Sequence, residues 1–253
     1  MLLRRITHHI KNQNWFAIFI DFIIVVAGVF IGIQVANWNE QRILFQKETQ
    51  LLNELKKEIQ SSITLTESKI QAYQQATDAG KRVLAFLDMQ KNCEENCWNL
   101  IVDFMHASQW QDIHINSSTY HNMRDNGFPT NRGIIDAVEA YLAQNSNNAV
   151  PFNILPIYRS LVRQIINIKT QEFYWKYCWS LKDGIEKYNL NCPKGISDEE
   201  SKSLVTEIIE NPGIKPNLTE WTGAIVSLPA TLGEQNVAAR KAIDLIDEEL
   251  RHR

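Results

Sequence analysis

The stretch FIDFIIVVAGVFIG, residues 19–32, is apolar apart from one carboxylate, that of Asp21. It lies within a longer apolar run from Phe16 to Ala36, in which fourteen of 21 residues are Ile, Val or Phe. At 1.5 Å per residue, a helix of this length spans roughly 30 Å, the thickness of the bilayer core. The apolar residues favour insertion by about 6 kcal/mol, and Asp21 opposes it by about 3 kcal/mol or less. The sequence therefore predicts a transmembrane helix over residues 15–38.

The ends of the run support an uncleaved anchor over a cleaved signal peptide. Trp15 and Trp38 bracket it at the two positions where aromatic side chains anchor a helix at the membrane interfaces. The apolar region of a signal peptide is only about 7–15 residues long and is followed by small residues at the cleavage site. This run is longer, and the segment IQVANWNE, residues 33–40, lacks that pattern.

Basic residues around the run favour an N-terminus in the cytoplasm. Three basic side chains and the amino terminus lie in the short segment 1–14, whereas only Arg42 and Lys47 follow the run closely. Basic residues concentrate on the cytoplasmic side, although the difference here is small. We therefore predict a single-pass membrane protein with a cytoplasmic N-terminus, with residues 39–253 forming a helical soluble domain outside the cytoplasm, in the periplasm.

Four cysteines supply an independent argument for the periplasm. Cys93 and Cys97 flank one short loop, and Cys178 and Cys192 lie in a second region. An even number in loop-like surroundings indicates two disulfides and an oxidising compartment. Three pairings exist, of which we favour Cys93–Cys97 and Cys178–Cys192 because each joins neighbours. The alternatives are a structural zinc site, which usually shows tighter spacing, and reduced buried thiols.

The soluble domain has the pattern of an all-α bundle. No Gly or Pro occurs between Gly32 and Gly80, so the transmembrane helix is predicted to continue to about Leu87. Its apolar residues recur at three-, four- and seven-residue spacing, and this stripe needs helical partners to cover it. Shorter helices are predicted at residues 95–108, 117–126, 131–145, 152–181, 198–211, 216–228 and 231–251.

Two segments resemble a family of uncharacterised bacterial single-pass membrane proteins. Residues 9–42, HIKNQNWFAIFIDFIIVVAGVFIGIQVANWNEQR, are similar to its N-terminal pattern QNW…IDF…GVFIGIQ…NWNE. Residues 118–127, STYHNMRDNG, are similar to a second stretch of that family. The resemblance implies membrane placement and a helical domain of about this size, and it implies no activity.

One face of the predicted transmembrane helix is suited to packing against another helix. At 100° per residue, Ala17, Gly28, Gly32 and Ala36 fall within about 60° of Asp21. Gly28 and Gly32 form a GxxxG pattern, and small residues let two helix backbones approach closely in a membrane. We predict that this face contacts a second copy of the chain or another membrane protein.

Asp21 itself has two interpretations. Its carboxylate can reach the nearby cytoplasmic interface or make a hydrogen bond across the helix pair, which is a packing role. Alternatively, it is a candidate proton site. A short cytoplasmic segment, one helix with an intramembrane acid and a periplasmic domain are similar in layout to proton-driven stator subunits, which work with a multi-span partner. A helical bundle departs from the periplasmic domains of those subunits.

The rest of the sequence offers no catalytic constellation. The net charge of −3 provides no basic surface for nucleic acid. His106, His114 and His121 lack metal-ligand spacing, so we predict neither a metal nor a cofactor. The aromatic segment FYWKYCW, residues 173–179, is interpreted as core packing around a disulfide rather than a ligand site. We therefore expect a membrane-anchored binding or scaffold protein without catalysis of its own; the alternative is a proton-coupled subunit using Asp21.

Overall fold

The structure, a computed structural model, describes residues 15–89, 91–182 and 185–253. Within these residues the fold is all-α apart from one small two-stranded sheet, which confirms the predicted fold class. The chain divides into two compact units, Met1–Leu52 and Asn53–Arg253. The predicted basic segment, residues 1–14, lies outside the described residues.

Helix α2, Trp15–Asp88, is a single helix of 74 residues. It has this length because the strongest helix breakers are absent from residues 33–79. The next glycine along the helix, Gly80, is explained by packing against another helix. A Cβ at this position would lie 2.5 Å from Oγ1 of Thr222 in α9, Ile214–Ile225. The missing side chain therefore lets the two helices lie close together.

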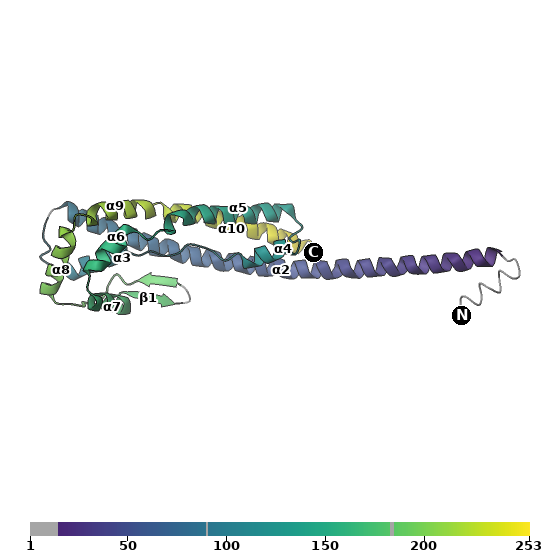
Figure 1. Cartoon of the computed structure of the whole chain (residues 1–253), viewed down its shortest axis with the longest axis horizontal. Helices are drawn as coiled ribbons and strands as arrows, with labels where there is room; N and C mark the ends of the chain where they lie inside the picture. The colour runs from purple at the N-terminus through teal and green to yellow at the C-terminus, as the bar shows by residue number, and fades with distance from the viewer. Residues whose placement is uncertain (1–14, 90, 183–184) are drawn as a thin grey trace. The chain divides into compact units, whose positions relative to one another are not determined.

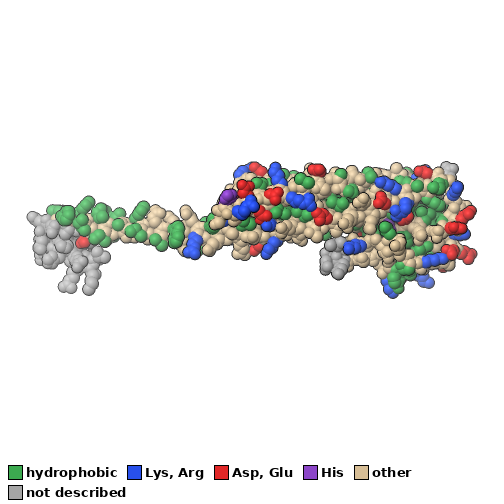
Figure 2. All heavy atoms as spheres, turned by 180° about the vertical axis from the view of Figure 1, so that it is seen from behind, with side chains coloured by type: hydrophobic (Ala, Val, Ile, Leu, Met, Phe, Trp, Pro, Cys, Tyr) green, Lys and Arg blue, Asp and Glu red, His purple; other side chains and the backbone are tan. Residues whose placement is uncertain are grey.

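The first unit consists, in its described part, of the N-terminal portion of α2. Hydrophobic side chains cover this portion, as Figure 2 shows, and none of its most apolar window is buried within the chain. Charged side chains gather on the other unit. The helix is long and apolar enough here to cross a membrane.

The second unit is a bundle that covers the C-terminal portion of α2. Helices α5 and α10 pack along each other, α3 packs on α8, and α6 packs on α9 (Figure 1). Ion pairs of Lys56 with Asp247 and of Arg240 with Glu67 join α10 to α2. The remaining elements are α3 Cys97–Ala107, α4 Ser118–Asp125, α5 Arg132–Ala149, η1 Val150–Phe152, α6 Ile157–Ile165, α7 Ile168–Tyr177, β1 Trp179–Lys182, β2 Ile185–Tyr188, α8 Asp198–Glu210 and α10 Leu228–Arg251.

The prediction of one helix over residues 152–181 is wrong, whereas the other predicted helices are confirmed within a few residues at their ends. Helix α6 begins only after Pro156, and α7 begins separately at Ile168, with Asn167 as its N-cap. The side chain of Asn167 accepts a hydrogen bond from the backbone N–H of Thr170, at 3.0 Å. Such caps favour a helix start over continuation of the preceding helix. After α7 the chain forms the antiparallel hairpin β1–β2.

Aromatic side chains dominate the core of the second unit. Tyr73 of α2 lies 5.2 Å from Phe152 between ring centroids, and Phe152 lies 6.0 Å from Trp221 of α9. Phe104 of α3 and Tyr158 of α6 are fully buried in the same cluster. Large buried rings of this kind contribute much of a core's stability through the apolar area that they remove from water.

Candidate functional site

The predicted packing face lies on the exposed N-terminal part of α2. Among the described residues, no atom lies within 4 Å of a Cβ built at Gly28 or Gly32, and Ala36 is exposed. The side chain of Ala17 lies outside the described residues. Asp21 is half-buried, and its Oδ2 has no hydrogen-bond partner among the described residues. The open space over both glycines is compatible with close approach of a second helix.

The two predicted interfacial anchors are also exposed. Trp15 begins α2 and Trp38 lies 23 positions further along the same helix, beyond the apolar run. Both indole side chains extend from the helix without burial in the chain. Their positions agree with the geometry that interfacial tryptophans require, an apolar segment of membrane thickness between them.

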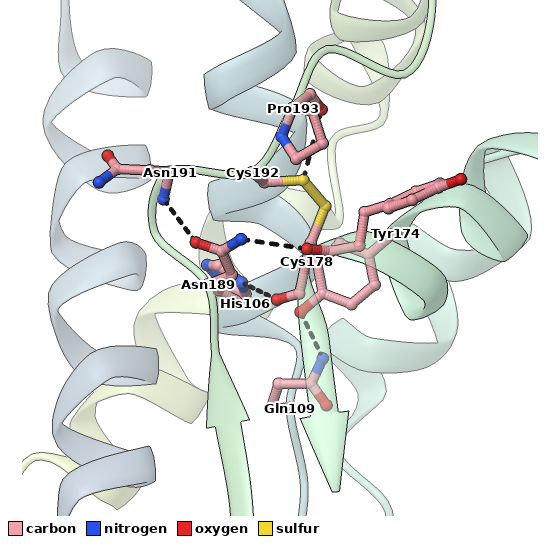
Figure 3. The surroundings of a disulfide bond; sticks show 9 residues. His106, Gln109, Tyr174, Cys178, Asn189, Asn191, Cys192 and Pro193 are labelled. Atoms are coloured by element: carbon pink, nitrogen blue, oxygen red, sulfur yellow. Dashed lines mark hydrogen bonds between the residues drawn. A yellow bond between two sulfur atoms is a disulfide. The ribbon is translucent and has the colours of Figure 1, made fainter.

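The structure contains both favoured disulfides. Cys93–Cys97 ties the segment after α2 to the first residue of α3, with a Cα–Cα distance of 5.7 Å. Cys178–Cys192 joins the end of α7 to the chain beyond β2, with a Cα–Cα distance of 4.9 Å (Figure 3). The second disulfide therefore closes the base of the hairpin, where the backbone N–H of Asn189 also donates to the Cys178 carbonyl at 2.8 Å.

A cluster of buried tyrosine hydroxyls lies around the segment that follows α3. The Tyr73 hydroxyl donates to the Gln111 carbonyl at 2.7 Å. The side-chain amide of Gln111 donates to Tyr188 of β2 at 2.7 Å, and that of Gln109 donates to Tyr174 of α7 at 2.9 Å. Burial raises the pKa of all three tyrosines above the usual value. The hydroxyls are therefore neutral and hold the hairpin and α7 to the bundle.

His106 lies at the centre of this aromatic region and is fully buried. Its ring stacks on that of Tyr188, with 5.2 Å between the ring centroids. Nε2 of His106 lies 3.4 Å from the Cys178 carbonyl oxygen (Figure 3). Burial lowers the pKa of His106 to about 4. The imidazole is therefore neutral near pH 7 and packs as an aromatic side chain.

The three histidines lie in different environments. His106 is buried, whereas His114 and His121 are exposed. Among the described residues, no group of three or more potential ligands is placed to hold a metal ion. Within the aromatic segment FYWKYCW, Tyr174 and Cys178 are buried, as expected for core packing. Helix α7 ends at Tyr177 within this segment, and β1 begins at Trp179.

The buried C-terminal end of α3 brings together residues that sequence patterns did not indicate. A helix end leaves carbonyl groups without intrahelical partners. Here the Tyr158 hydroxyl donates to the Phe104 carbonyl at 3.1 Å. The Trp221 indole N–H donates to the Ala107 carbonyl at 2.9 Å. The Arg159 guanidinium donates to the Ser108 carbonyl at 2.8 Å. These donors come from α6 and α9, at least 51 positions away along the chain, so no local motif could have identified them.

No family model, curated protein or solved structure matches this chain. The family resemblance of residues 9–42 and 118–127 stays a prediction.

Proposed function

We propose that this chain is a single-pass protein of the bacterial inner membrane that acts as a helical binding or scaffold protein. In this proposal the N-terminus is cytoplasmic and the helical bundle is periplasmic. Association with a second copy, or with another membrane protein, occurs through the face of α2 that carries Asp21, Gly28 and Gly32. The bundle then presents its surface to periplasmic partners.

One observation carries this proposal. The N-terminal part of α2 exposes a continuous apolar surface, and the positions above Gly28 and Gly32 are open. An exposed apolar surface of this extent requires a non-aqueous environment or a partner, because burying it removes unfavourable contact with water. The two disulfides support the periplasmic location of the bundle, since disulfides persist in oxidising compartments.

The test is purification of the tagged full-length chain from membranes in mild detergent, followed by identification of its companions. The double substitution Gly28→Leu/Gly32→Leu is compared with Val26→Leu/Phe30→Leu. The latter residues lie about 140° and 180° around the helix from Asp21. We expect association to be lost only in the glycine variant. A glycine variant that keeps every companion of the wild-type chain would refute the proposal.

A second candidate function is supported by the carboxylate of Asp21, the only acidic side chain in the apolar run from Phe16 to Ala36. Intramembrane acids are candidates for proton transfer. In this alternative the chain is a subunit of a proton-coupled complex with a multi-span partner. Recovery of such a partner in stoichiometric amount, with Asp21→Asn abolishing function but not assembly, would favour it. Unchanged function of Asp21→Asn would leave Asp21 a packing residue.

A further inference from the structure

Two arginines of α6 hold positive charge in the bundle without an acidic partner. Arg159 and Arg163 are four residues apart, so they share one face of the helix. Both side chains are half-buried, and neither forms an ion pair within the described part of the chain. Nη2 of Arg163 is buried and has no acceptor among the described residues. A buried charged donor without an acceptor is energetically unfavourable.

The contacts that the pair makes are all with neutral groups of the chain. Arg159 donates from Nη1 to the Ser108 carbonyl at 2.8 Å, and Arg163 donates from Nε to the Ser108 hydroxyl at 3.0 Å. The Arg163 guanidinium also lies 4.9 Å from the centre of the Trp175 ring. These contacts orient both guanidinium groups, but they supply no full negative charge.

The nearby negative groups do not balance the two charges. The C-terminal end of α3 supplies about half an elementary charge. The tyrosines around the pair are neutral, because burial raises the pKa of Tyr174 and Tyr188. The Glu186 carboxylate acts on Arg159 through its charge, without a hydrogen bond between the two side chains. Its Oε2 instead accepts a hydrogen bond from the indole N–H of Trp179 at 3.1 Å. Burial and the neighbouring Arg159 together lower the pKa of Arg163 to about 10, which leaves both groups charged at neutral pH.

We propose that Arg159 and Arg163 form a binding site for a small molecule that carries an oxyanion, a phosphate or a carboxylate group. Guanidinium groups present several N–H donors in a planar fork that matches such oxygens, and paired arginines recognise these groups in many proteins. The ligand supplies the missing acceptors and the missing negative charge. This site lies in the bundle and does not depend on the proposed role of the membrane helix.

The experiment is calorimetric titration of the full-length protein in detergent with inorganic phosphate and, separately, with succinate. Sodium chloride at equal ionic strength controls for screening of surface charge. We expect saturable binding of one or both anions. Binding of phosphate alone or of succinate alone would identify which oxyanion the site prefers. Absence of saturable binding of both anions would overturn the proposal.

Three substitutions locate the site. Arg159→Gln and Arg163→Gln should each weaken binding by about tenfold or more, since each removes charge-assisted hydrogen bonds. Arg132→Gln is the matched control, because Arg132 is exposed and paired with Asp136 on α5. Equal affinity of Arg163→Gln and the wild-type chain would overturn the assignment, as would an equal loss in Arg132→Gln.

A further pair of measurements separates loss of binding from loss of folding. Without added anion, Arg163→Gln should unfold at the same temperature as the wild-type chain or higher, because it removes a charge that lacks a partner. Arg163→Lys keeps the charge but loses the planar fork, so it should fold and bind several-fold more weakly. If Arg163→Gln fails to fold, Arg163→Lys tests the proposed site in its place. An anion affinity of Arg163→Lys equal to that of the wild-type chain would contradict the proposal.

Discussion

The two parts of helix α2 carry similar apolar residues in opposite environments. Ile24 in the N-terminal part is 61% exposed, whereas Ile59 in the C-terminal part is 3% exposed. Within the unit Asn53–Arg253, the later helices cover the apolar stripe of α2, and salt bridges such as Lys56–Asp247 border it. None of the most apolar window of the N-terminal part is buried within the described residues. Side chains of the same type therefore form a protein core in one part and an exposed apolar surface in the other; under the proposed function, that surface contacts lipid or a partner.

The largest effect should come from a cavity in the covered part. Phe104→Ala removes a fully buried ring and should lower the free energy of unfolding by about 3–5 kcal/mol. Denaturant unfolding followed by near-ultraviolet circular dichroism measures this change. Phe30→Ala, in the exposed part of α2, is the control and should leave the transition unchanged. An equal loss in both variants would mean that the two parts of α2 are stabilised in the same way.

A charge in the exposed part should instead act on membrane insertion. Val26→Arg places a cation in the apolar run and should oppose insertion by about 3 kcal/mol. After the penalty of Asp21, the apolar run favours insertion by only a few kcal/mol. The fraction of Val26→Arg that resists alkaline extraction from membranes should therefore be lower than that of the wild-type chain. Gln60→Arg, at an exposed position of the covered part, should keep the wild-type fraction. A full membrane fraction for Val26→Arg would contradict a transmembrane assignment.

Acid should destabilise the bundle through His106. Its pKa is lowered to about 4 in the folded state, whereas an unfolded histidine titrates near 6.5. Below pH 6.5 the unfolded state therefore binds a proton at His106 more readily than the folded state does. The free energy of unfolding falls as the pH is lowered, until the pH reaches the folded-state pKa of His106. The loss due to this group should be about 2–3 kcal/mol at pH 4.5 relative to pH 7.

Denaturant unfolding of the wild-type chain and two variants, at pH 4.5 and pH 7, isolates the contribution of His106 to the acid-induced loss of stability. His106→Phe keeps an aromatic ring in the stack with Tyr188 but cannot titrate, so its acid-induced loss should be smaller by this amount. His121→Asn removes an exposed histidine and should behave like the wild-type chain. The same acid-induced loss in His106→Phe and the wild-type chain would show that His106 is not responsible.

The smallest expected effect is the difference between the contributions of the two disulfides to the free energy of unfolding. Cys178–Cys192 spans 14 positions and should contribute about 3 kcal/mol, whereas Cys93–Cys97 spans 4 and should contribute about 2 kcal/mol. Serine substitution of each pair, followed by denaturant unfolding, measures the difference. A larger loss from the Cys93–Cys97 pair would show that loop closure does not govern their contributions.

The sequence predicted those features whose signals are contiguous along the chain. The apolar run around Asp21 and the unbroken helix α2 follow from composition within one window, and the disulfides follow from cysteines that are neighbours in sequence. The hairpin was missed because β1 and β2 have only four residues each and follow a helix rich in aromatic residues.

The cluster at the end of α3 could not be predicted for a different reason. The contacts of Arg159 and Arg163 with Ser108 join positions 51 and 55 residues apart, and that of Tyr73 with Gln111 joins positions 38 apart. Each residue alone looks like an ordinary surface or core residue. Only the packing of α2, α3 and α6 brings them together and reveals that the two guanidinium groups lack a counter-charge.

The most direct test of the proposed function is the mass of the detergent-extracted particle, measured by light scattering with correction for bound detergent. We expect the wild-type particle to contain more than one membrane-protein chain, and the Gly28→Leu/Gly32→Leu particle to contain one. Because a Cβ at either glycine meets no atom of the described residues within 4 Å, the substitution should leave the bundle folded. A wild-type particle of a single chain, or equal masses for the two proteins, would contradict association through this face.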